Sequence, residues 1–145
     1  MHLESRPLKF STITHHASVT QCLGSIGGHV WYLGVAKPSI VPSNKVNYDN
    51  DKKAVQAHCG HLYVPPAVED VKVFKVSSSK FVKLNIGTWH AGPLFKAETM
   101  DFYNLELSNT NVRLCAFPLS EFSMYHICCP RFFKGSLHVM SFLPN

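Results

Sequence analysis

The sequence predicts an all-β protein whose strands form an antiparallel barrel or sandwich. Short stretches of β-branched and aromatic residues recur along the chain, and turns rich in glycine, proline, serine or asparagine separate them. No stretch has the apolar spacing of a convincing amphipathic helix. The chain has 145 residues, which is the length of one domain with a substantial core.

The first three predicted strands lie in the N-terminal part of the chain. Residues Leu8–Thr14 are β-formers that alternate between two faces, and Val19–Leu23 follows as a second short strand. The glycines at residues 24–28 indicate a turn. Val30–Ala36 is apolar on both faces, as in a buried central strand, whereas the polar residues 39–56 indicate a long surface loop.

Further strands are predicted between residues 71 and 107. Val71–Val76 and Phe81–Ile86 flank three serines, a pattern typical of a hairpin, and Asp101–Leu107 is another strand. Residues 112–145 contain phenylalanines without a clear period, and the pattern assigns them no fold. We therefore expect a β domain over residues 1–111 and a tail over residues 112–145.

Composition and charge narrow the class of protein. Hydrophobic residues make up 46% of the chain and charged residues 16%, which is typical of a globular protein. No apolar run has the length of a membrane span, and the N-terminus lacks the apolar core of a signal peptide, so we expect a cytoplasmic protein. The net charge is +5, but the basic residues are scattered singly, so we expect no nucleic-acid partner and no membrane partner.

The five cysteines are an odd number without a Cys-x-x-Cys pair. This argues against a disulfide framework and a zinc ribbon, so we expect reduced thiols. The run His58-Cys59-Gly60-His61 contains ligand types that suit zinc. It has no matching second half elsewhere in the chain, which favours a simple loop before a strand.

Residues 85–94 contain the main candidate site. Two glycines, a proline, Trp89 and His90 follow an alternating strand, which predicts a sharp turn that holds His90 at the rim of a binding site. His16 and Gln21 supply an imidazole and an amide oxygen five residues apart, and both could reach the same pocket. Together with His90 they predict a site for one divalent transition metal ion. From spacing alone, a surface or hydrogen-bonded histidine pair is an open alternative.

Three neighbours of His90 are candidate ligand-binding residues. The Lys83 ammonium could bind a carboxylate, and the Asn85 amide could bind a urea-like group. The alternative for both is a strand edge that faces solvent. Trp89 could stack on a ligand, although a tryptophan is more often part of the core.

The segments Leu8–Gln21, Trp31–Pro38 and Val71–Leu107 resemble the ureidoglycolate lyase family, cupin-like β-barrel proteins once called ureidoglycolate hydrolases. The most specific element is the order Trp-His, Pro-Leu, Asp-Phe between residues 89 and 102. The resemblance covers about residues 6 to 111 and is closest to plant-type members. In wider cupin terms, residues 87–90 are similar to the Gly-x-x-His of the second cupin motif.

The resemblance implies an RmlC-like jelly-roll barrel that cleaves ureidoglycolate to glyoxylate and urea in allantoin catabolism. The implied ligand is thus a small ureide or carboxylate. The implied catalytic residues are His90, His16 and Lys83. The implied substrate-binding residues are Gln21, Asn85 and Trp89. The implied metal ligands are His16, Gln21 and His90.

The sequence also departs from the family. Thr14 replaces the earlier histidine of the first cupin motif and Gln21 replaces its glutamate, which weakens a metal ligand set. The chain begins close to its first strand, and the resemblance stops after residue 111, so we expect an incomplete barrel whose strand edges favour association, such as a homodimer. These departures leave two alternatives to an enzyme: a non-catalytic protein that binds a small anion, and an inactive truncated isoform.

Overall fold

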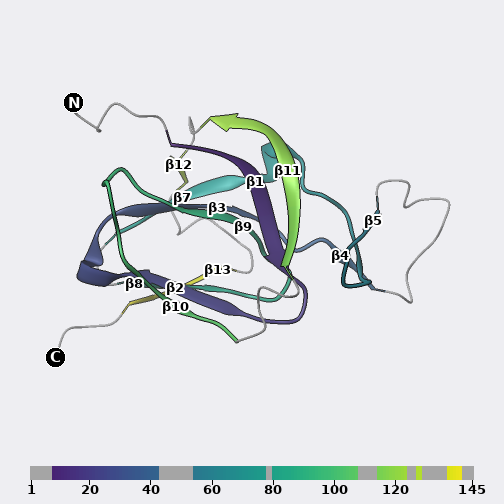
Figure 1. The fold of residues 1–145 in the computed structure, drawn as a ribbon, viewed down its shortest axis with the longest axis horizontal. Helices are drawn as coiled ribbons and strands as arrows, with labels where there is room; N and C mark the ends of the chain where they lie inside the picture. The colour runs from purple at the N-terminus through teal and green to yellow at the C-terminus, as the bar shows by residue number, and fades with distance from the viewer. Residues whose placement is uncertain are drawn as a thin grey trace.

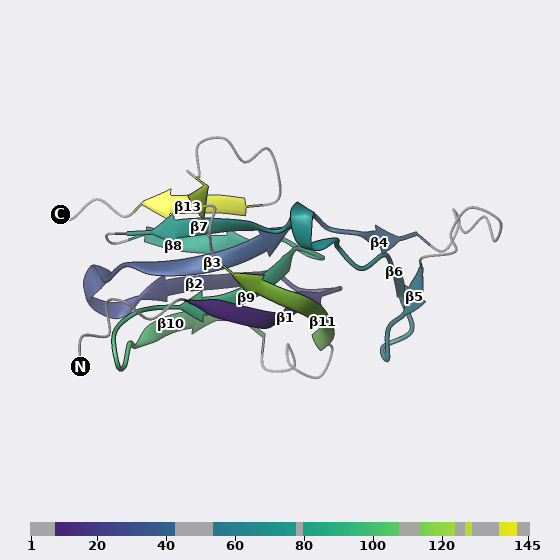
Figure 2. The same cartoon turned by 90° about the horizontal axis from the view of Figure 1, so that it is seen from above.

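The computed structural model describes residues 8–42, 54–77, 80–107, 114–123, 127–128 and 137–141. Figure 1 shows two facing layers of strands, and Figure 2 shows a small third sheet at one end of them. The predicted all-β class is confirmed, since the described helical elements are two short 3-10 turns, η2 (Ile26–Gly28) and η4 (Val68–Asp70). Within these ranges the sheets do not close into a barrel. None of the described helices is long and apolar enough to cross a membrane.

The two main layers are a six-stranded and a four-stranded sheet. In spatial order the six-stranded sheet contains β11 (Leu114–Ser123), β1 (Lys9–His16), β9 (Trp89–Leu94), β3 (Trp31–Ala36), β7 (Lys72–Val76) and β12 (Ile127–Cys128). In spatial order the four-stranded sheet contains β10 (Phe102–Leu105), β2 (Gln21–Ser25), β8 (Lys80–Leu84) and β13 (Leu137–Ser141). The small sheet contains β4 (Ile40–Val41), β6 (Leu62–Tyr63) and β5 (Val55–Gln56). Among the described residues, the strand pairs are antiparallel except for β12 with β7.

Strands β3 and β9 at the centre of the six-stranded sheet, and the end of β1, carry buried side chains on both faces, because side chains alternate between the faces of a strand. We call the face toward the four-stranded sheet the inner face. Its core cluster joins Trp31, Leu33 and Val35 of β3 to side chains of β2, β7 and β8. The opposite, outer face has a second cluster, which joins Trp89 of β9 to side chains from η4, β6 and β11. The chain therefore has two interiors that share one sheet.

The predicted sharp turn at residues 85–94 is wrong for most of its length. Trp89–Leu94 forms β9, which lies between β1 and β3. The turn itself is confined to the residues before it, where the Thr88 amide donates to the Asn85 carbonyl at 3.1 Å. Gly92 and Pro93 lie where the β3–β9 register shifts, so they mark an irregularity within a strand.

The predicted hairpin of Val71–Val76 with Phe81–Ile86 is also wrong. The two segments form β7 and β8, but β7 pairs with β3 and β8 pairs with β2 and β13. They belong to different sheets, so the chain crosses from one layer to the other between them. Local spacing cannot distinguish this crossing from a hairpin, because both need a short polar connection between two strands.

Two other predictions change in the structure. The ends of the predicted loop at residues 39–56 form β4 and β5, while its centre lies outside the described residues. The tail at residues 112–145, to which no fold was assigned, contributes β11, β12 and β13. These strands pair with β1, β7 and β8.

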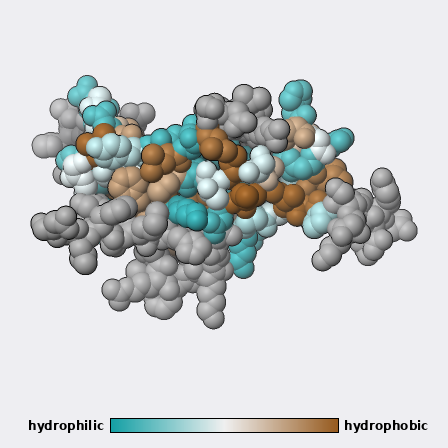
Figure 3. Space-filling view, turned by 90° about the horizontal axis from the view of Figure 1, so that it is seen from below, coloured by the Kyte–Doolittle hydropathy of each residue, from teal (hydrophilic) through white to brown (hydrophobic). Residues whose placement is uncertain are grey.

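The outer side of the four-stranded sheet carries exposed apolar side chains. Tyr103 and Leu105 of β10 are exposed, and Tyr103 stacks on Phe81 of β8. Figure 3 shows apolar residues gathered in patches on this side of the molecule. Exposed apolar patches of this kind favour association with other surfaces.

Replacing Gly87 by alanine is expected to destabilise the fold by about 2 kcal/mol or more. Gly87 has a φ of +77°, and an added Cβ would lie 2.9 Å from Ile40 Cδ1, so the substitution introduces both backbone strain and a steric clash. Gly60→Ala is the matched control, because Gly60 has a φ of +91° but no atom within 4 Å of an added Cβ. Urea unfolding should show the smaller loss for Gly60→Ala. Equal losses would contradict a steric contribution at Gly87.

Candidate functional site

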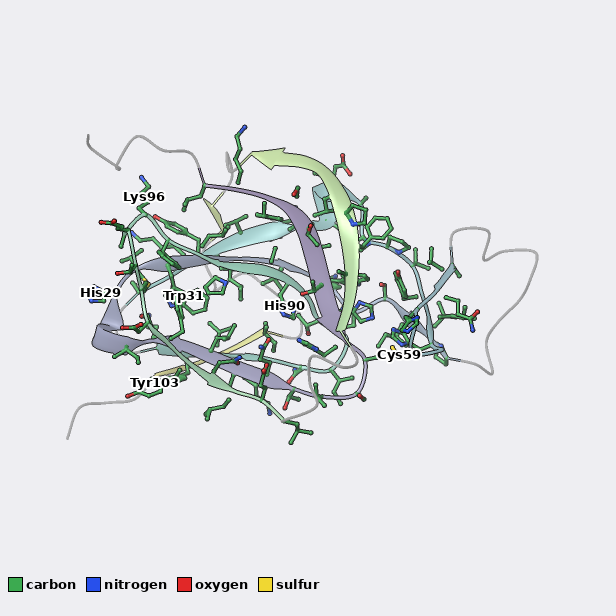
Figure 4. The ribbon with its side chains drawn as sticks, in the orientation of Figure 1. His29, Trp31, Cys59, His90, Lys96 and Tyr103 are labelled. Carbon is green, nitrogen blue, oxygen red and sulfur yellow. The ribbon has the colours of Figure 1, made fainter. Side chains whose placement is uncertain are left out.

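His16 and His90 meet on the inner face of the six-stranded sheet. Thr14 of β1 pairs with His90 of β9, and alternation places His16 on the same face as Thr14. The two imidazole rings are 5.3 Å apart between centroids, and both side chains are buried. Figure 4 shows His90 between the two layers of strands. The structure thus brings together two of the predicted donors from strands that lie far apart in the sequence.

Two contacts hold this pair in place. The Thr14 hydroxyl donates to the His90 carbonyl at 3.2 Å, which adds a side-chain contact to the β1–β9 pairing. The Gly87 amide donates to the His16 carbonyl at 2.8 Å, so the turn before β9 is attached to the end of β1. Both strands are therefore tied together on either side of the histidine pair.

The hydrogen bond of His90 determines which ring nitrogen is available. Nδ1 lies 3.1 Å from the Thr88 carbonyl oxygen. A carbonyl only accepts, so Nδ1 must carry a proton. In the neutral ring, Nε2 then has a lone pair that can accept a proton or bind a metal ion.

The pKa of His90 supports the neutral ring. Burial lowers this pKa from 6.5 to about 4. The bond to the Thr88 carbonyl and the charge of Glu106 oppose the shift, whereas the neighbouring His16 adds to it. His90 is therefore uncharged at neutral pH and is able to act as a base through Nε2.

Gln21 is oriented by two polar side chains of the neighbouring segment. Its Nε2 donates to Glu106 Oε2 at 2.8 Å and to Asn104 Oδ1 at 3.1 Å. An ionised carboxylate only accepts, so the amide nitrogen must face Glu106. The opposite atom, Oε1, is buried and has no hydrogen-bond partner among the described residues. Gln21 thus presents an acceptor oxygen within the interior.

Asn104 and Glu106 are site residues that the sequence pattern did not identify. They come from β10 and the residues just after it, and more than 80 positions separate them from Gln21. The register pairs Asn104 with Leu23 and Leu105 with Cys22, so its continuation places Glu106 opposite Gln21. The alternation within Asp101–Leu107 shows that Asn104 and Glu106 share a face, but it does not show which strand they face.

The structure does not bring Lys83 to this cluster. Lys83 is exposed and pairs with Cys22, whereas the neighbouring pair of Gln21 and Leu84 is buried. Because side chains alternate, Lys83 lies on the outer face of the four-stranded sheet, opposite to the Gln21 side chain. Its field instead acts on the Cys22 thiol, whose pKa is raised by burial and lowered by the Lys83 charge.

Trp89 lies on the opposite face of the six-stranded sheet from the histidine pair, and Asn85 lies in the turn after β8. Trp89 is fully buried on the outer face, where its indole N–H donates to Ser39 Oγ at 2.8 Å. It belongs to the core cluster of that face. Asn85 is half-buried, follows the end of β8, and accepts the turn hydrogen bond through its carbonyl.

A divalent metal ion would have three lone-pair donors in this region. His90 Nε2 and Gln21 Oε1 are oriented by their partners so that their lone pairs are available, and His16 supplies a second imidazole ring. These donor types suit a transition metal. Among the described residues, no three histidine, cysteine, aspartate or glutamate side chains are arranged to bind a metal ion, so the amide oxygen of Gln21 is needed for a third ligand.

Comparison with known proteins adds no assignment: no protein-family model, no curated protein and no solved structure matches the chain. The candidate site therefore rests on its own geometry and on the motif resemblance given above.

Lowering the pH from 7 to 5 is expected to destabilise the protein. Burial lowers the pKa of His90 and of His15 to about 4, against 6.5 for an ordinary histidine. Between these values the unfolded chain binds more protons than the folded one, so stability is retained above pH 6.5 and falls until about pH 4. Each histidine should account for on the order of 2 kcal/mol at pH 5.

Urea unfolding of the wild type and of His90→Gln at the two pH values would measure this effect. The variant should lose less stability between pH 7 and pH 5, because it lacks one of the two buried groups. An identical loss in both proteins would show that His90 is not responsible.

Proposed function

We propose that the chain is a ureidoglycolate lyase-like enzyme that releases glyoxylate and urea in ureide catabolism, on a cupin-like arrangement of its sheets. The observation that carries the proposal is the buried pair of His16 and His90 on the six-stranded sheet, which faces the four-stranded sheet that carries the buried Gln21. The motif resemblance links these three positions to the family. The two facing, mostly antiparallel sheets are compatible with that fold.

The chemistry of the substrate matches the groups at the site. Ureidoglycolate has one carbon that carries a hydroxyl, a carboxylate and a urea nitrogen. Cleavage requires a base for the hydroxyl proton and an acid for the departing nitrogen. As the proton leaves the hydroxyl, a carbonyl forms and the carbon–nitrogen bond breaks, so one proton moves from oxygen to nitrogen overall.

We assign the two halves of that transfer to His90 and His16. The lone pair of His90 Nε2 takes the hydroxyl proton, because Nδ1 is held by the Thr88 carbonyl. The His16 ring, 5.3 Å away, delivers a proton to the leaving nitrogen. Gln21 Oε1 accepts a hydrogen bond from the urea group, and Glu106 and Asn104 keep the amide in that orientation.

The substrate carboxylate needs a positive charge that the described side chains around His90 do not supply. Lys83 lies on the far side of the sheet, and Glu106 would repel an anion. A divalent metal ion bound by His16, Gln21 and His90 would supply this charge. In that arrangement His90 is a ligand, and its role as a base would pass to a neighbouring group.

The second candidate function is a pocket that binds a small carboxylate or ureide without converting it. The outward position of Lys83 favours this alternative, because the implied set of three catalytic side chains is not assembled. Fold alone does not determine activity. Thermal stabilisation by such ligands without product formation would support the binder.

The variant His90→Ala is expected to reduce glyoxylate release from ureidoglycolate by about 100-fold or more, because it removes a side chain that acts either as general base or as a ligand of the metal ion. The control is His29→Ala, which removes an exposed histidine at the other end of the layers (Figure 4). Circular dichroism would check that both variants fold. Equal rates for wild type and His90→Ala would exclude His90 from the mechanism.

Removal of divalent metal ions is expected to abolish activity, since Glu106 would otherwise face the substrate carboxylate uncompensated. The assay compares protein treated with a chelator, the same protein after addition of zinc or manganese, and Gln21→Ala under both conditions. Activity should return with metal in the wild type and remain low in the variant. Full activity in the chelated wild type would contradict a metal requirement.

A further inference from the structure

The outer face of the six-stranded sheet carries a second polar cluster, separate from the candidate site on the inner face. His15 precedes His16 on β1, so its side chain points to the opposite face. It is fully buried there against Trp89, with ring centroids 4.1 Å apart. This cluster brings β1 together with the segment before β6, more than 40 residues further along the chain.

Three side chains of the cluster form a continuous chain of contacts. Cys59 Sγ lies 3.2 Å from His61 Nδ1, and His61 Nε2 lies 2.8 Å from His15 Nε2. Each imidazole nitrogen in this chain either donates or accepts according to its tautomer. When His61 Nε2 donates to His15, the Nδ1 atom of His61 has a lone pair directed at the cysteine.

The surroundings fix the two rings and leave the sulfur accessible. The His15 ring packs edge-on against His61 and Tyr63, both at 5.1 Å between centroids. Cys59 is exposed on a turn in which the Gly60 amide donates to the Ala57 carbonyl. Figure 4 shows Cys59 beside the small sheet, away from His90. A half-buried histidine, His61, thus lies beside an exposed thiol and is backed by the fully buried His15.

We propose that Cys59, His61 and His15 form a reactive-thiol site that is modified by low-molecular-weight disulfides. A thiol, a base within hydrogen-bond distance and a third group that orients the base are the components of an activated nucleophile. His15 is the third group and acts as a positioning residue for His61. Its own Nδ1 is buried without a hydrogen-bond partner among the described residues, so its ring is held by packing and by His61.

The reaction is a thiol–disulfide exchange, which needs no other oxidant than the small disulfide. His61 Nδ1 takes the proton of the Cys59 thiol, and the thiolate attacks one sulfur of the disulfide. A new sulfur–sulfur bond forms, the old one breaks, and the leaving thiolate takes the proton from His61. Cys59 is oxidised to a mixed disulfide and one molecule of the small thiol is released. Burial lowers the pKa of His61, so the ring is neutral and able to accept the proton.

The first test measures the reaction of Cys59 in the folded full chain at pH 7. The probes are oxidised glutathione and a chromogenic aromatic disulfide, and peptide mapping by mass spectrometry gives the rate at each cysteine. We expect Cys59 to react at least about tenfold faster than in the chain unfolded by guanidinium. An equal or slower rate in the folded chain would overturn the proposal, and this comparison needs no variant.

The second test identifies the base. His61→Gln should lower the Cys59 rate to that of the unfolded chain, while His58→Gln is the matched control, because His58 is an exposed histidine of the same turn and should keep the wild-type rate. His15→Phe retains a ring against Trp89 and should reduce the rate several-fold. If Cys59 reacts at the wild-type rate in His61→Gln, His61 is not the base. If it does so in His15→Phe, His15 does not position His61.

Discussion

The burial of both faces of the central strands of the six-stranded sheet is the constraint on which the rest of the structure depends. In a strand, consecutive side chains enter opposite environments. Here both environments are interiors, so β1 and β9 direct their residues alternately into two separate cores. His15 and His16 are adjacent in the sequence, yet one packs against Trp89 and the other against His90. The dipeptide His15-His16 thereby contributes one side chain to the polar cluster on each face of the sheet.

Desolvation determines what these histidines can do. A buried imidazole loses the hydration that stabilises its charged form, which lowers the pKa of His15 and His90 to about 4. Both rings are then neutral acceptors or donors at physiological pH rather than cations. Hydrogen bonds determine which atom of each side chain is left as an acceptor. The Thr88 carbonyl accepts from one nitrogen of His90, and the Glu106 carboxylate accepts from the amide nitrogen of Gln21. The remaining lone pairs define the inner site.

Sequence reasoning succeeded where local composition is sufficient. The β-branched and aromatic stretches predicted most of the described strands, because strand preference depends on side chains fitting a pleated surface. It failed where partners are distant. Gly92 and Pro93 suggested a turn but lie within β9, and the serines before β8 suggested a hairpin although the chain changes sheet there. Glu106 was missed because its contact with Gln21 depends on the register of β10 against β2.

The sequence by itself determined the all-β class and the presence of His16, Gln21 and His90 as candidate donors. These properties follow from residue type and from the two-residue period of a strand. Only the tertiary structure decided which strands pair, that Lys83 faces outward, and that Cys59 and His61 lie against His15. Those facts depend on long-range register and layer packing, in which a side chain's neighbours come from segments that its own sequence environment does not specify.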